Sequence, residues 1–197
     1  MALVKPVRTE KGTPWFGIVP VSIWDFKDRS ADYDWADLFL SCEVKIENSE
    51  YNRFVEIAGQ LDRDPNGQVT GGNVLKRIYR FFEVIGCDAG INTQGKWEDA
   101  DGQVIEDIGS YLNERYTTGN PIMDPSYKHL AYIYKAAPKT PGGKVYTRCL
   151  PRLASNDTEG HKDLKSHVEW MTSKGYLREV TETSSNGEAT KTQLNNL

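Results

Sequence analysis

Basic and aromatic side chains are interleaved through residues 126–153, SYKHLAYIYKAAPKTPGGKVYTRCLPRL. The segment carries six Lys and Arg side chains and no Asp or Glu. Cationic side chains neutralise phosphates, and flat aromatic rings stack on unpaired bases. Lysines and tyrosines are also common on solvated strands, so the absence of acidic residues is the informative feature. The pattern predicts a surface that binds single-stranded nucleic acid.

Strand alternation indicates which of these side chains share a face. Within residues 144–153 it places one aromatic and three cationic side chains on the face that looks away from the core. We expect outward-facing residues of three earlier strands to extend the same groove. The predicted binding residues are Trp24, Phe39, Lys45, Arg53, Phe54, Tyr134, Lys135, Lys139, Lys144, Tyr146, Arg148 and Arg152.

A calcium-binding loop is the main alternative to a nucleic-acid-binding site. Residues 62–70, DRDPNGQVT, match the first half of an EF-hand loop, with oxygen ligands at positions one, three and five and glycine at six. Position twelve is Asn73 where a bidentate glutamate is needed, and position four is Pro65. We therefore expect a turn-rich connection and no bound metal.

Catalytic patterns are weak. An acidic run at 98–107 could hold Mg²⁺ in a two-metal nuclease, but Asp101-Gly102 is foremost a hairpin turn. His161 and His167 are six residues apart, too far around a helix to share a metal. The motifs GxSxG, GxxxxGK[ST] and GxGxxG are absent. We expect no enzymatic activity and no cofactor.

Five segments have the composition or alternation of strands. Residues 15–26 are β-branched and aromatic, whereas 37–47 and 53–61 alternate apolar and polar positions. The last two predicted strands lie near 130–138 and at 144–153, joined by the turn former KTPGG.

Three segments have helical spacing. The clearest is 74–85, where Val74, Ile78, Phe81 and Ile85 recur on one face and Gly86 follows. Residues 105–116 predict a short second helix and residues 161–174 a third.

Three strands, a helix, an inserted segment and two strands follow the order of an OB-fold, a five-stranded and partly open Greek-key barrel. The expected fold class is therefore α+β, mainly β with helices; another small α+β domain is the alternative. We expect the barrel at 14–155 with an insert at about 87–125, a capping helix at 156–178 and a polar tail at 179–197.

Charge is segregated along the 197 residues. The formal net charge is −4, which alone argues against an acidic partner, yet residues 1–125 carry −8 and residues 126–153 carry +6. Cys42, Cys87 and Cys149 form no CxxC pair, which favours a reducing cytoplasm. The first residues, MALVKPVRTEKG, contain no apolar signal, and no apolar run is long enough for a membrane span.

Four segments carry a family resemblance: ADLFLSCEVKIENSEYNRFVEI, VLKRIYRFFEVIG, GKWEDADGQ, and the hairpin that runs from YIYK to GGKVYTRCLPRL. Over roughly residues 14–155 the chain resembles the OB-fold single-stranded DNA-binding proteins encoded by bacteriophages. The resemblance implies a small, non-enzymatic protein of the host cytoplasm that coats intermediates of DNA replication and recombination. It also implies replication or recombination proteins as partners.

The C-terminus departs from that family. Many such proteins end in an acidic tail tipped by an aromatic or hydrophobic residue, whereas this chain ends in QLNNL and has Glu182, Glu188 and Lys191 in its last 17 residues. Recruitment of partners through the tail is therefore not expected. The alternative function is a non-catalytic phage interaction or structural protein whose OB-like barrel binds no nucleic acid.

Overall fold

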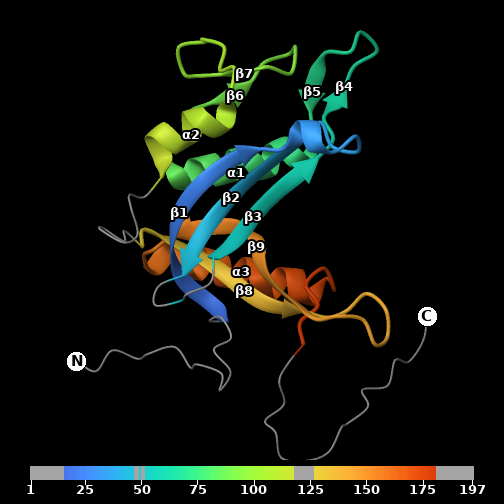
Figure 1. Ribbon diagram of the computed structural model, residues 1–197, viewed down its shortest axis with the longest axis vertical. Helices are drawn as coiled ribbons and strands as arrows, with labels where there is room; N and C mark the ends of the chain where they lie inside the picture. The colour runs from blue at the N-terminus through green and yellow to red at the C-terminus, as the bar shows by residue number, and fades with distance from the viewer. Residues whose placement is uncertain (1–15, 47–48, 50–51, 118–126, 181–197) are drawn as a thin grey trace, which may run out of the picture.

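The computed structural model describes residues 16–46, 49, 52–117 and 127–180. These residues form one five-stranded antiparallel sheet, two short hairpins and three α-helices (Figure 1). The sheet contains β1 (Gly17–Asp28), β2 (Leu38–Ile46), β3 (Asn52–Gly59), β8 (His129–Ala136) and β9 (Tyr146–Ser155). The helices are α1 (Asn73–Ile85), α2 (Ile108–Tyr116) and α3 (Thr158–Ser173), and a 3-10 turn, η1, spans Ser30–Asp32. The predicted α+β class is confirmed.

The five long strands lie side by side in the order β3-β2-β1-β8-β9, and each neighbouring pair is antiparallel. The two edge strands, β3 and β9, therefore run parallel, and they approach each other closely. Within the described residues no backbone hydrogen-bond ladder joins them. The sheet is thus not closed into a barrel, and the OB-fold expected from the sequence is not confirmed. We call the open line between β3 and β9 the seam.

Alternation along the strands builds the main core. Val21 and Ile23 of β1, Cys42 and Val44 of β2, and Val55 of β3 all point to the same buried face. α1 adds apolar residues at helical spacing, and it contacts both β3 and β9, so it covers one end of the seam. The buried residues of α1 are Val74, Leu75, Ile78, Phe81 and Phe82. Gly86 ends the helix in the left-handed conformation that glycine adopts most readily.

A β-bulge interrupts β1 at Asp25, whose φ of 35° is positive. The side chain of Asn113, on α2, binds the backbone at this point. The Phe26 N–H donates to Asn113 Oδ1 at 2.7 Å, and Asn113 Nδ2 donates to the Phe26 carbonyl at 2.8 Å. The amide thus satisfies two backbone groups of Phe26 beside the bulge, where β1 extends past its pairing with β8.

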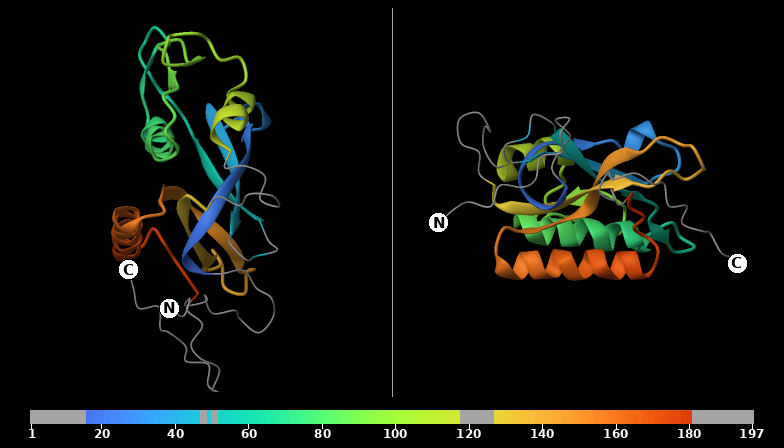
Figure 2. Two further views of the ribbon diagram at one scale, coloured as in Figure 1. Left: turned by 90° about the vertical axis from the view of Figure 1, so that its left-hand side faces the viewer. Right: turned by 90° about the horizontal axis from the view of Figure 1, so that it is seen from below.

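A second, smaller core lies on the outer face of β8 and β9. α3 packs there through Leu164 and, with Leu177, covers Leu130 and Leu150 (Figure 2). Asp157 caps the helix by accepting a hydrogen bond from the Gly160 N–H. A helix therefore lies within the segment 156–178, packed on β8 and β9.

The chain after α3 pairs with the sheet. The Ala137 N–H donates to the Arg178 carbonyl, the Val180 N–H donates to the Lys135 carbonyl, and Glu179 forms a bridge with Ala136. These contacts continue the line of β1 beside the end of β8. The start of the predicted polar tail is therefore part of the sheet, and residues 181–197 lie outside the described residues.

Two hairpins form the end of the molecule opposite β8 and β9. One pairs β4 (Asp62–Arg63) with β5 (Val69–Gly71), and the other pairs β6 (Gly90–Ile91) with β7 (Trp97–Glu98). Three turns at this end of the molecule share one hydrogen-bond pattern. A side-chain oxygen of Asp or Asn accepts hydrogen bonds from the backbone N–H groups two and four residues further along the chain, and a glycine lies three residues further along. This pattern starts at Asp64, Asn92 and Asp99. The loops behind the calcium and nuclease readings thus contain hairpin turns in which Asp64 and Asp99 bind the backbone of their own turn.

Candidate nucleic-acid interface

A hollow of about 480 Å³ opens at the seam, which we call the seam groove. β3 contributes Arg53, Phe54 and Glu56, and β9 contributes Tyr146 and Arg148. These two strands are more than 85 residues apart in the chain, and they meet here because they are the two edges of the bent sheet. The seam groove therefore unites predicted binding residues from both halves of the sequence.

Two aromatic side chains that line the seam groove are about half exposed. Phe54 is 52% exposed and Tyr146 is 57% exposed. An apolar ring left in water costs free energy that packing would otherwise recover, so paired exposed rings beside a groove are typical of a binding surface. Their faces offer stacking surfaces for unpaired bases.

Arg53 lies on the opposite face of β3 from the one assigned by the sequence. It shares the parity of Val55 and Ile57, so it points to the core side at the end of the strand. There it lies near Cys149: burial raises the pKa of that thiol to about 12, and the positive charge of Arg53 opposes the rise. Arg53 Nη1 also donates to the Asn52 carbonyl at 2.7 Å. Its cation therefore lies at the floor of the seam groove.

A second hollow of about 470 Å³ lies under the β8–β9 loop, and we call it the hairpin groove. It is lined by the cationic side chains of Lys139, Lys144 and Arg178, which are exposed. Tyr134, Tyr146 and Arg148 line both grooves. The seam and hairpin grooves are therefore adjacent parts of one surface.

Tyr134 forms the shared floor. Its ring stacks on Tyr132 with centroids 6.0 Å apart, and Tyr132 Oη donates to Glu179 at 2.7 Å. Burial raises the pKa of Tyr134, and the nearby charge of Arg148 lowers it. This stacking and the strand that carries Glu179 hold the floor in place between the cations.

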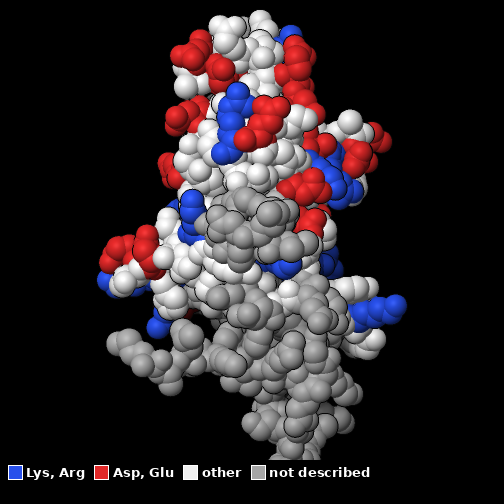
Figure 3. Space-filling model, turned by 60° about the vertical axis from the view of Figure 1, so that its left-hand side comes forward, with Lys and Arg blue, Asp and Glu red and all other residues white. Residues whose placement is uncertain are grey.

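The acidic side chain that lines the seam groove has a cation of its own. Glu56 lies 3.7 Å from Arg29. The cations in and around the two grooves thus outnumber the carboxylates that face them. Figure 3 shows acidic side chains gathered instead at the end of the molecule that carries the β4–β5 and β6–β7 hairpins.

Arg152 was predicted in the groove, but it lines neither the seam groove nor the hairpin groove. The pairing register of β8 with β9 shifts between Ala131 and Ile133, where β9 holds two extra residues, so Arg152 keeps the parity of Arg148. The α3 helix covers this part of the face. Arg152 Nη2 donates to both carboxylate oxygens of Asp163 on α3, at 2.8 and 2.6 Å, and its side chain is only 10% exposed. The Arg152–Asp163 salt bridge connects β9 to α3.

Phe39 and Lys135 also lie elsewhere. Phe39 is buried under Tyr33, whose ring stacks on it at 4.8 Å, and Arg29 covers it at 5.1 Å. The Lys135 ammonium lies 5.1 Å from the Phe16 ring centroid. Neither lines the two grooves.

Trp24 and Lys45 lie on the outer face of β1 and β2. Trp24 Nε1 donates to Ser22, and the register aligns Trp24 with Glu43 and Glu43 with Phe54. Glu43 thus separates Trp24 from the groove. Lys45 is opposite Asn52, a residue that lines the seam groove, so it lies at the rim.

Tyr176 and Arg178 line the hairpin groove although the basic and aromatic pattern of the sequence did not predict them. The usable signal was the period-two alternation of YLREV after Gly175, with Leu177 buried between two exposed side chains. A short strand paired with the end of β8 explains that pattern.

No family model, curated protein or solved structure matches the chain. The phage-protein resemblance therefore stays a prediction. None of the described helices is long and apolar enough to cross a membrane. The described residues also contain no group of three His, Cys, Asp or Glu side chains placed to hold a metal ion. Function is therefore inferred from the geometry of the grooves.

Proposed function

We propose that the protein binds single-stranded DNA, with little sequence preference, through the seam and hairpin grooves. The supporting observation is the surface shared by Tyr134, Tyr146 and Arg148, where exposed rings and cations from distant strands surround two joined hollows. Arg148, Lys139, Lys144 and Arg178 are placed to neutralise phosphates, and Phe54 and Tyr146 to stack on bases. Stacking needs unpaired bases, so a duplex is the poorer ligand.

The proposal includes an OB-like fold. The chain runs through three long strands, a helix and two long strands, and the first strand lies between the second and the fourth. This is the strand order of the OB-fold, in which the third and fifth strands flank the partly open side. OB-folds bind oligonucleotides across a strand face and adjoining loops. A groove bordered by β3, β9 and the β8–β9 loop is consistent with that use.

The resemblance supplies the biological setting of the proposal. We place the protein among non-enzymatic, phage-encoded proteins that coat single strands during DNA replication and recombination in the host cytoplasm. Replication or recombination proteins are its expected partners. The side chains in the grooves need no cofactor for this role.

Titration of labelled oligo-dT by fluorescence anisotropy tests the proposal. Tyr146→Ala should weaken binding by about 1–3 kcal/mol because one base loses its stack. Arg148→Ala should weaken binding and reduce the salt slope by about 0.7, since one phosphate contact is lost.

Lys96→Ala is the matched control for Arg148→Ala. Lys96 is an exposed cation in the turn of the β6–β7 hairpin, away from both grooves. It should leave affinity unchanged. Equal effects of Lys96→Ala and Arg148→Ala would show only a general charge effect, and no complex at micromolar wild-type protein in low salt would refute the proposal.

A further inference from the structure

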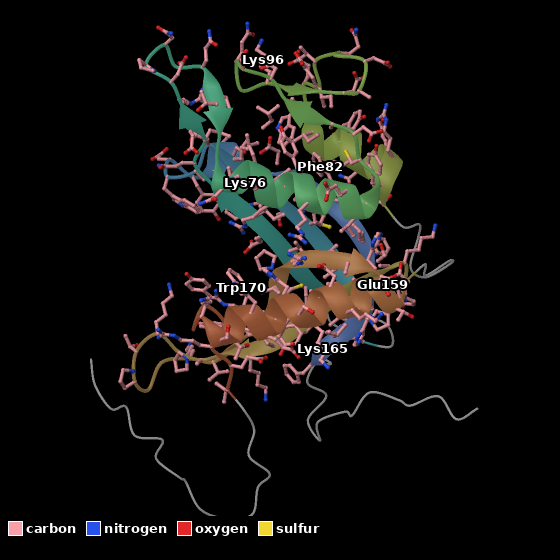
Figure 4. The ribbon with its side chains drawn as sticks, turned by 180° about the vertical axis from the view of Figure 1, so that it is seen from behind. Lys76, Phe82, Lys96, Glu159, Lys165 and Trp170 are labelled. Carbon is pink, nitrogen blue, oxygen red and sulfur yellow. The ribbon has the colours of Figure 1, made fainter. Side chains whose placement is uncertain are left out.

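A third hollow, of about 500 Å³, lies between α1 and α3, and we call it the α1–α3 cleft. Leu150 and Leu153 of β9 belong to its lining. Figure 4 shows the two helices side by side, with Lys76 of α1 and Trp170 of α3 at the same end. Of the binding residues predicted from the sequence, Arg152 alone lines this cleft.

One wall of the cleft is cationic. Lys76, Arg77 and Arg80 are exposed and lie within a single turn of α1. Arg80 lies 3.5 Å from Asp163, but that carboxylate already accepts two hydrogen bonds from Arg152. Lys76 makes no ion pair with any described residue. The wall thus keeps positive charge that the protein does not neutralise.

Arg77 adds a partly desolvated cation to this wall. Burial lowers the pKa of its guanidinium, and its Nη1 donates to the Ala58 carbonyl at 3.3 Å. Because a guanidinium has five N–H donors, most of them remain for a ligand. Planar guanidinium groups bind phosphate oxygens in a bidentate manner.

The other wall is aromatic. Trp170 is 48% exposed and Tyr176 is 68% exposed, with ring centroids 5.7 Å apart. The His167 ring stacks on Trp170 at 5.7 Å and 24°. Burial, aided by the charges of Arg152 and Arg80, lowers the pKa of His167, so this ring is neutral at pH 7. The indole is thereby held in place while much of its surface stays in water.

The cleft is continuous with the two grooves. Tyr176 lines both the α1–α3 cleft and the hairpin groove, and Pro151 lines both the cleft and the seam groove. From this continuity we infer that the cleft is a second binding segment for the same DNA strand. Bases stack on Trp170 and Tyr176, and phosphates bind Lys76, Arg77 and Arg80. The inference rests on the proposed function and extends it to a longer binding site.

Comparison of two oligomer lengths tests this inference. A single OB-fold covers about 4–16 nucleotides, so a dT of about 6 nucleotides should fill only the grooves, whereas one of about 20 should also enter the cleft. The double variant Lys76→Ala with Trp170→Ala removes two exposed side chains, one from each wall. It should weaken binding of the longer oligomer by roughly 5- to 150-fold and leave binding of the shorter one unchanged.

Lys165→Ala is the control variant, since Lys165 is an exposed cation of α3 that does not line the cleft. It should bind both lengths as the wild type does, and thermal melting should show that all variants are folded. If the double variant binds both lengths normally, the cleft takes no DNA although the proposed function stands. Equal weakening at both lengths also overturns the inference, because the cleft is then part of the primary site.

Two further outcomes would overturn a DNA-binding role for the α1–α3 cleft. If wild-type protein binds neither length, the proposed function itself fails and the inference fails with it. If the double variant loses binding of an acidic peptide that contains tryptophan but keeps wild-type affinity for the longer dT, the cleft is a peptide site and the inference is wrong.

Discussion

Phe54 and Tyr146 illustrate how single side chains determine binding at the residue scale. Both are large rings that the fold leaves about half exposed at the seam groove, next to Arg148. Arg152, only four residues further along β9, has its charge neutralised by Asp163 and serves packing. The residue type alone does not tell a binding arginine from a packing arginine. Its exposed fraction and the presence of an ion-pair partner do.

His129 gives a prediction for pH at this scale. The side chain is buried, its Nδ1 has no hydrogen-bond partner among the described residues, and burial lowers its pKa to about 4 from the ordinary value of 6.5. The unfolded chain therefore binds a proton that the folded chain excludes. The contribution of neutral His129 to the free energy of unfolding is therefore fully present above pH 6.5, and it is lost as the pH falls toward 4.

Urea denaturation at pH 7.5 and pH 5 measures this effect. We expect the wild type to lose about 2 kcal/mol of unfolding free energy from His129 over this interval. His129→Gln should remove that part of the pH dependence, whatever its own effect at pH 7.5. An unchanged difference between the two pH values in the variant would contradict the assignment, because His167 would then be its source.

Bulges determine the geometry at the element scale. The one in β1 turns Asp25 to a positive φ, and Asn113 of α2 binds the displaced Phe26 backbone. That single extra residue reverses which side chains of β1 face the core, so Ile23 before the bulge and Phe26 after it are both buried. The irregularity in the β8–β9 pairing adds two residues to β9, so Arg152 keeps the parity of Arg148 and meets Asp163 of α3.

Asn113→Ala tests the contribution of the β1 bulge. The variant leaves the Phe26 N–H and carbonyl without their side-chain partner, and we expect a loss of about 1–3 kcal/mol in the unfolding free energy. Glu114→Ala is the matched control, because Glu114 is its neighbour on α2 and is exposed. It should change stability by less than about 0.5 kcal/mol. Equal values for the two variants, measured by urea denaturation, would mean that the amide does not stabilise the bulge.

Periodicity predicted the elements well. Period-two alternation predicted β2, β3 and β9, and the spacing of Val74, Ile78 and Phe81 predicted α1, because burial of one face forces both patterns. The first strand, β1, was predicted from its β-branched and aromatic composition. Alternation could not show that α3 covers the face that carries Arg152, where Asp163 binds its guanidinium. Arg53 was assigned outward although it has the parity of Val55, which a strict count would have placed correctly.

Long-range pairing explains what the sequence could not predict. Seam contacts between β3 and β9 join residues far apart in the chain, and the pairing of Glu179 with Ala136 depends on where α3 delivers the chain. Lys76, Arg77 and Arg80 of α1 were not singled out from the sequence. The sequence also could not show that His167 and Trp170 of α3 face them across a cleft.

Charge is segregated at the scale of the whole molecule. The net charge is −4, yet the acidic hairpins lie at one end of the molecule (Figure 3). The hollows lined by cationic side chains border β9 and α1. Three hollows share lining residues in pairs, so they form one surface. An acidic end repels a polyanion, and a cationic surface attracts it, which orients a DNA strand toward the grooves.

Ultraviolet cross-linking of an oligo-dT of about 20 nucleotides tests the central claim most directly, because it reports where the strand lies. Mass spectrometry of the digested complex should find cross-linked peptides that contain Phe54 and Tyr146. Excess unlabelled oligo-dT should remove these cross-links. Cross-links confined to the β4–β5 and β6–β7 hairpins, or none at micromolar protein in low salt, would contradict the account.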